Sequence, residues 1–176
     1  MGKAKLRIAS KIALFLALYC AVLGSFCNLS PGDEMGWTIL VFWFIVPAAT
    51  LLASMLIQLD LERTVKRVPV PANITMIVLF GAASMMLPLL TFGLMAGGGV
   101  REYFSDSIPQ FMIGAIASLV GIAIGKSISV DPGDGLSEEQ AEKRTKKRAA
   151  LAALLIIAVP VILVVVIGLI NASAWN

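Results

Sequence analysis

The chain has 176 residues, of which 59% are hydrophobic and only 14% are charged, and its mean hydropathy is +0.91. Charged residues usually make up about a quarter of a water-soluble domain, so this composition excludes an ordinary soluble protein and predicts an integral membrane protein. The net charge is +3, but the basic residues border apolar stretches. Membrane topology and anionic headgroups explain them better than nucleic-acid binding does.

Five apolar stretches are long enough, or nearly so, to cross a bilayer core about 30 Å thick as helices of roughly 20 residues. They cover residues 12–27, 37–57, 74–96, 108–125 and 149–170, and the first extends back to cover about 8–27 if Lys11 reaches the headgroups. All 14 basic and all 11 acidic residues fall outside the five unextended stretches, as expected where lipid is the solvent. The sequence therefore predicts one all-α transmembrane domain, residues 1–176, built as a bundle of five transmembrane helices.

Lys and Arg in the connections predict the orientation of this bundle. The N-terminal segment and the connections 58–73 and 126–148 hold thirteen of the fourteen, whereas the connections on the other side hold only Arg101. The positive-inside rule then makes the N-terminus cytoplasmic and the C-terminus exoplasmic. Alternatively, the first stretch is a secretory signal cleaved near residues 22–24, which would leave four spans with the same orientation.

Small residues recur every fourth position in two of the stretches. The rows are Ala13, Ala17, Ala21 and Ser25 in the first stretch, and Ala117, Gly121 and Gly125 in the fourth. Such faces let helices approach closely in lipid, where packing drives association. We predict that the fourth stretch packs on another helix along its row. The expected neighbour is the alanine row of the first stretch, with a second subunit as the alternative.

The fifth apolar stretch is predicted to continue a helix that begins in the cytoplasm. Ser137 and Gln140 fit a capping box, and no helix breaker follows until Pro160, so residues 138–148 would form a cytoplasmic helical extension. Favourable i,i+4 pairs on this extension are Glu139 with Lys143 and Glu142 with Lys146. The basic run on it consists of Lys143, Arg144, Lys146, Lys147 and Arg148. This run is predicted to contact anionic lipid or a partner, although topogenesis alone would also explain it.

Three short patterns favour no particular chemistry. Residues 121–127 have three residues between their glycines, where a phosphate-binding loop needs four. The turn at 131–135 lacks the alternating acids of a calcium loop. The sequons at 28–30 and 171–173 are interpreted as chance matches.

The five apolar stretches contain no Asp, Glu, Lys, Arg or His, so they offer no residue for intramembrane acid–base or metal catalysis. Their polar residues are expected to be interhelical hydrogen-bond partners: Thr50, Ser54, Ser84, Thr91, Gln110 and Ser118. We therefore expect no enzyme, catalytic residue, cofactor or metal. In style the chain resembles small multi-pass proteins of the bacterial inner membrane. The leading hypothesis is an accessory, regulatory or immunity-type subunit that assembles with itself or a larger membrane protein; the alternative is a small-solute transporter or channel component.

Overall fold

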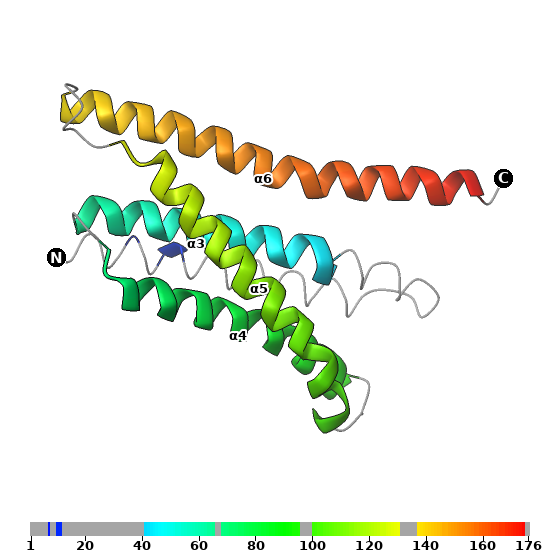
Figure 1. Cartoon of the computed structure of the whole chain (residues 1–176). Helices are drawn as coiled ribbons and strands as arrows, with labels where there is room; N and C mark the ends of the chain where they lie inside the picture. The colour runs from blue at the N-terminus through cyan, green and yellow to red at the C-terminus, as the bar shows by residue number, and fades with distance from the viewer. Residues whose placement is uncertain are drawn as a thin grey trace. The chain divides into compact units, whose positions relative to one another are not determined.

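The computed structural model describes residues 7, 10–11, 41–65, 68–95, 100–130 and 137–174. These residues form helices and include no strand (Figure 1). The elements are the π-helical turn η1 (Val41–Ile45), α3 (Val46–Thr64), α4 (Val70–Met95), α5 (Val100–Ile128) and α6 (Glu138–Ala174). The chain divides into two compact units, Met1–Ser129 and Val130–Asn176. The all-helical part of the prediction is confirmed for the described residues.

In the first unit, α5 is the helix that joins the other two. It packs along both α3 and α4, which touch each other much less (Figure 1). All three helices contribute to one apolar cluster, made of Val46, Ala49, Ala53, Ile57, Met76, Phe80 and Ile122. The position of α5 therefore determines the position of both neighbours.

α3 and α4 each have a proline in their first turn. Pro47 lies in the first turn of α3, where its missing N–H would have no intrahelical partner. It cannot donate to the carbonyl of Trp43, and the turn directly before it widens into η1. After α3 ends, α4 begins at Val70 with Pro71 in its first turn. Both prolines thus mark helix starts and cost little.

The connection predicted at residues 97–107 is shorter than expected, because α5 already begins at Val100. Nothing between Val100 and Ser107 breaks a helix, and the charges of Arg101, Glu102 and Asp106 are tolerated at an end of a helix. With 29 residues, α5 is about 43 Å long, which exceeds the thickness of a bilayer core. Its apolar part, Ser107–Ile128, leaves those three charges outside.

Two helical segments in the described part of the chain are long and apolar enough to cross a membrane, Trp43–Thr64 and Ser107–Ile128. Val70–Met86 is a shorter apolar helix. This criterion rests on length and composition, which some core helices of soluble proteins also satisfy. The number of five spans and the orientation of the termini therefore stay predictions. The apolar stretch 12–27 lies outside the described residues.

The second unit contains α6, a single helix of 37 residues that continues through Pro160. It begins with the reciprocal cap expected from the sequence. The Ser137 N–H donates to Gln140 Oε1 (3.4 Å), and the Gln140 N–H donates to Ser137 Oγ (3.3 Å). Thr145, just over one turn after Gln140, accepts a hydrogen bond from the Val130 N–H at 3.2 Å. This bond ties the start of the second unit to α6.

Candidate functional site

In the described part of the first unit, α5 approaches α3 very closely at two glycines. A Cβ atom on Gly121 would overlap Ser54 Oγ and the carbonyl oxygen of Leu51. A Cβ atom on Gly125 would lie 2.9 Å from Gln58 Cβ and 3.0 Å from the carbonyl oxygen of Met55. Backbone cannot move aside as a flexible side chain can, so only glycine fits at Gly121. Gly121 meets Ser54, and Gly125, four residues later on α5, meets Gln58, four residues later on α3. The two helices therefore run parallel here.

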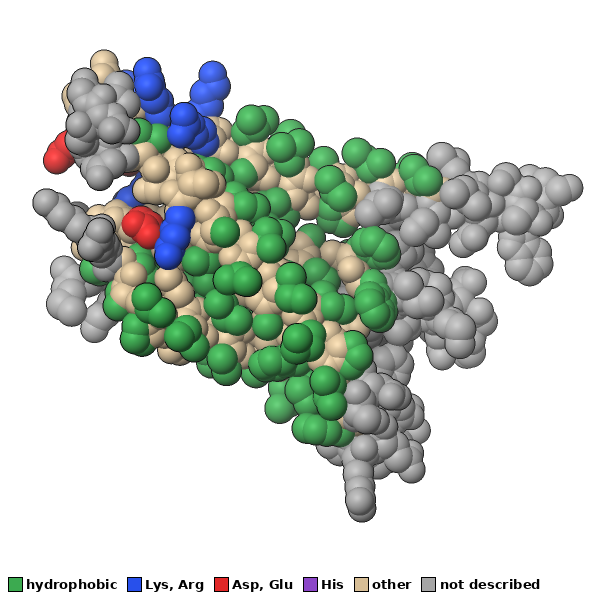
Figure 2. Space-filling view, in the orientation of Figure 1, with side chains coloured by type: hydrophobic (Ala, Val, Ile, Leu, Met, Phe, Trp, Pro, Cys, Tyr) green, Lys and Arg blue, Asp and Glu red, His purple; other side chains and the backbone are tan. Residues whose placement is uncertain are grey.

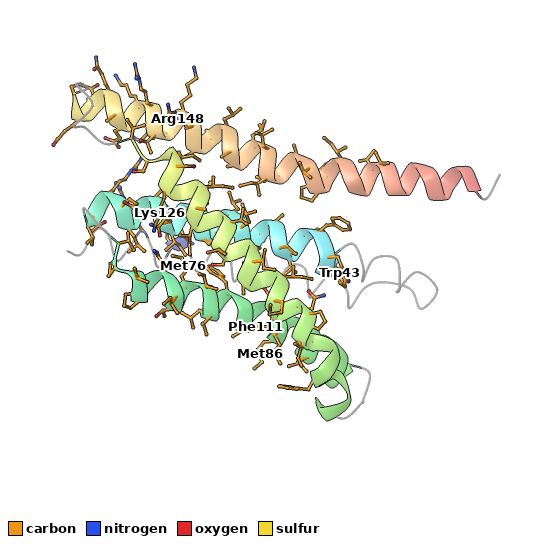
Figure 3. The ribbon with its side chains drawn as sticks, viewed as in Figure 1. Trp43, Met76, Met86, Phe111, Lys126 and Arg148 are labelled. Carbon is orange, nitrogen blue, oxygen red and sulfur yellow. The ribbon has the colours of Figure 1, made fainter. Side chains whose placement is uncertain are left out.

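The contact of α5 with α4 uses two further glycines. A Cβ atom on Gly114 of α5 would lie 2.5 Å from Ser84 Cβ and 3.0 Å from the carbonyl oxygen of Phe80. In the reverse direction, the ring of Phe111, labelled in Figure 3, lies against Gly81 of α4. Its nearest carbon is 2.9 Å from where a Cβ of Gly81 would be. Glycine on either helix thus lets the other approach, and α5 is held from both sides.

The small-residue row of the fourth stretch lies inside the protein, with Ala117, Gly121 and Gly125 all buried. Its neighbour at Gly121 and Gly125 is α3, which was not among the neighbours expected from the sequence. The reason is a second row of small and polar residues four apart on α3, namely Thr50, Ser54 and Gln58, which accommodates α5. The other predicted packing row, Ala13, Ala17, Ala21 and Ser25, lies outside the described residues.

A seam of buried polar side chains follows these contacts. Thr50, Ser54, Ser84 and Ser118 are almost completely buried. Thr50 Oγ1 and Ser84 Oγ lie 3.5 Å apart, which joins α3 to α4. Ser54 instead donates to the carbonyl oxygen of Leu51 in its own helix, at 3.0 Å. The expected interhelical hydrogen bond is therefore present for one pair and replaced by a local bond at Ser54.

Among the described residues, four buried oxygen atoms have no hydrogen-bond partner: Gln58 Oε1, Asn73 Oδ1, Gln110 Oε1 and Ser118 Oγ. Gln58 is fully buried, and its Nε2 donates to Glu62 Oε1 at 2.7 Å while its Oε1 is left over. A buried polar atom without a partner costs about 1–3 kcal/mol, so such atoms are rare and call for an explanation.

An ion pair lies at the C-terminal end of α3. Lys11 Nζ contacts Asp60 Oδ2 at 2.5 Å and donates to the carbonyl oxygen of Leu56 at 3.0 Å. The Asp60 side chain is 8% exposed and that of Lys11 is 25% exposed. The sequence had suggested that Lys11 reaches the headgroups. In the structure it contacts a carboxylate and a carbonyl oxygen of α3 instead.

The basic run lies on the first turns of α6, and all five of its side chains are exposed. Lys143 Nζ pairs with Glu139 Oε1 at 2.8 Å, and Lys146 Nζ pairs with Glu142 Oε1 at 2.9 Å. These are the two i,i+4 pairs predicted from the sequence. Such exposed pairs contribute about 0.3–0.5 kcal/mol each, so they shape the local charge more than they stabilise the fold.

The rejected motifs gain no support. Residues 121–127 are helical throughout in α5, and residues 131–135 lie outside the described part of the chain. Within the part of the chain that the structure describes, no three His, Cys, Asp or Glu side chains gather to hold a metal ion.

Comparison with known proteins yields no match to a protein-family model, a curated protein or a solved structure.

Two features of the site, the polar row on α3 and the Lys11–Asp60 pair, have a signal in the sequence. Thr50 and Ser54 in the second stretch and Gln58 directly after it are four residues apart, so they share one face of a helix. Lys11 and Asp60 lie beside the same predicted membrane face, where opposite charges attract strongly because they are partly shielded from water. The unpartnered acceptors could not have been found, because they depend on side-chain packing.

Replacing Gly121 with leucine should destabilise the protein by about 1–3 kcal/mol or more, because the added side chain meets the backbone of α3. The measurement is a thermal melt of the purified protein in detergent. Ala123→Leu is the matched control, because Ala123 is an exposed residue on the same helix and should change stability by less than about 0.5 kcal/mol. Equal melting temperatures for the two variants would contradict the packing described.

Replacing Lys11 with aspartate should also destabilise the protein, because it leaves the buried Asp60 carboxylate facing a like charge. The pair lies between the exposed and the fully buried cases, so a loss of about 1–3 kcal/mol is expected. Adding Asp60→Lys should restore part of the loss in a thermal melt. No recovery in the double variant would mean that the attraction between the two charges contributes nothing.

Proposed function

We propose that this chain is a polytopic membrane protein of the cell membrane with five transmembrane helices. The observation that carries the proposal is the reversal of the usual distribution of side chains. Buried polar residues lie in the contacts between helices beside the apolar cluster, whereas many large apolar residues lie on the outside (Figure 2). On α5, for example, the row Ile108, Met112, Ile116 and Val120 is exposed, and the opposite face is small or polar. Water would oppose this arrangement, and lipid favours it.

Two contacts support the proposed five-span topology. Lys11, at the start of the first stretch, reaches Asp60, just beyond the second stretch, so these ends lie on one side of the membrane. The parallel course of α3 and α5 at Gly121 and Gly125 is what a topology requires in which the second and fourth spans cross in the same direction. Together with the distribution of Lys and Arg, they favour a cytoplasmic N-terminus and an exoplasmic C-terminus.

Within that frame, the proposed role is a non-enzymatic subunit that assembles with itself or with a larger membrane protein. The glycine contacts of α5 make the first unit a close-packed scaffold. They also occupy the row at Gly121 and Gly125 within the chain, so assembly would use other surfaces. Among the described residues, α6 offers such a surface, because it exposes large apolar residues from Leu151 to Val166. Accessory, regulatory and immunity-type proteins would all fit this role.

The test of this role is purification of the tagged full-length chain in mild detergent, followed by mass measurement of the particle and identification of co-purifying proteins. A defined oligomer or a stoichiometric membrane partner is expected. A monodisperse monomer without a partner would contradict the subunit role. Because it would leave the membrane topology untouched, the two parts of the proposal can fail separately.

A small-solute transporter or channel component is the second candidate, and the unpartnered acceptors favour it. Gln58, Gln110 and Ser118 place buried oxygen atoms at different depths along the contacts of α5, as a polar path would. The overlap of Ser54 with any Cβ on Gly121 argues against an open path in this conformation. Flux of small polar solutes into liposomes that contain the protein, lost on Ser118→Val, would favour transport over assembly.

The topology itself is tested with reporters. A reporter fused after Asn176 should read exoplasmic, and one inserted at Gly133 should read cytoplasmic, because thirteen of the fourteen Lys and Arg residues lie on the predicted inner side. Alkaline phosphatase and a fluorescent protein provide complementary readouts at both sites. If the two sites read the same side, an odd number of spans between them is excluded and the five-span topology is wrong.

A further inference from the structure

The positive charges at the start of α6 are compensated unevenly. Lys143 and Lys146 each have a glutamate partner within 3 Å, at 2.8 and 2.9 Å. Arg144, Lys147 and Arg148 have no ion-pair partner among the described residues, and their side chains are exposed; Arg148 is labelled in Figure 3. Three uncompensated cations thus lie within two turns of helix.

These three cations occupy the same side of α6 as its exposed apolar residues. Arg144 and Arg148 are four residues apart, and the row continues through Leu151 and Leu155, which are 61% and 56% exposed. Lys147 lies beside this row. The glutamates lie toward the other side.

A second row on α6, about a quarter of a turn from the first, is less exposed. It consists of Ala141 and Thr145, which are buried, followed by Ala149, Ala152 and Ile156, which are half-buried. Other exposed apolar side chains, such as Leu154 and Ile157, lie outside the row of Arg144 and Arg148, but Leu151 and Leu155 continue that row directly.

We propose that this exposed row is a binding site for an anionic phospholipid, an inference that rests on the proposed membrane location. The guanidinium groups of Arg144 and Arg148 would hold the phosphate, because arginine forms paired charge-assisted hydrogen bonds with phosphate oxygens. Lys147 adds a third positive charge. The acyl chains would lie along Leu151 and Leu155.

The order of groups along the row identifies the occupant as a lipid rather than a soluble anion. Cations are followed directly by leucines, so the ligand must present a phosphate and then a long apolar portion in the same sequence. Topogenesis depends on the number of basic residues in a connection and not on the side of the helix they occupy. It gives no reason for the glutamates to lie on one side and the uncompensated cations on the other.

The experiment compares lipids retained by the purified full-length protein. The protein in mild detergent receives equal amounts of phosphatidylglycerol and phosphatidylcholine with identical chains, and native mass spectrometry measures which is bound. The wild type should prefer phosphatidylglycerol. Arg144→Gln with Arg148→Gln should reduce that preference by up to about 30-fold, since each basic residue near an anionic surface contributes roughly a factor of five. Glutamine keeps the helix propensity nearly unchanged.

The matched control is Lys143→Gln with Lys146→Gln, which removes the same charge from the same turns. It should keep most of the preference. An equal loss in both double variants, or no preference in the wild type, would overturn the site. Displacement of the lipid by equimolar glycerol 3-phosphate would also overturn it, because the site would then recognise the phosphate alone.

Extraction of membranes at alkaline pH separates this inference from the proposed function. Wild type and both double variants should stay in the membrane pellet. Release of the wild type would contradict the membrane location itself, whereas retention of all three proteins with unchanged lipid preference would contradict only the lipid site.

Discussion

The backbone contact between α5 and α3 at Gly121 and Gly125 is the constraint on which the first unit depends. If lipid surrounds the helices, as proposed, apolar burial drives little association between them and close packing must do so instead. A side chain at Gly121 would separate the two helices, and α4 would move with α5 because Gly114 and Gly81 hold them together. The hydroxyl groups of Thr50 and Ser84 then meet because the helices are close.

The exposed apolar residues and the positions of the charges are also explained by the proposed lipid surroundings. In the proposed membrane location, lipid would accept the exposed apolar rows of α4, α5 and α6 and would confine charged side chains to helix ends. Lys11 and Asp60 satisfy each other at one such end, where a single charge would be costly. On α6 the transition from charge to apolar surface occurs between Arg148 and Leu151. We propose that the helix emerges from the bilayer there and that the headgroup site marks this level.

The sequence was sufficient to predict the helical class, the start of α6 and both of its ion pairs, because caps and i,i+4 pairs depend on neighbours in the chain. It also identified the row at Gly121 and Gly125 as a packing face. It did not predict α3 as the neighbour, since several rows of small residues compete and spacing does not rank them. The early start of α5 was missed because charged residues in 100–107 were interpreted as a connection, although charge at a helix end does not stop the helix. The unpartnered oxygens of Gln58 and Ser118 depend on tertiary packing, which no local pattern encodes.

The central claim is that lipid surrounds the exposed apolar side chains. Spin labels at Leu79→Cys, Leu119→Cys and Leu155→Cys, in a protein with Cys20 and Cys27 replaced by serine and reconstituted in liposomes, test it most directly. Ser118→Cys serves as the buried control. The account predicts that the three exposed labels are accessible to oxygen, which concentrates in lipid, and protected from a water-soluble nickel complex, whereas the buried label is protected from both. Ready access of the nickel complex to the three exposed labels would place those surfaces in water and contradict the account.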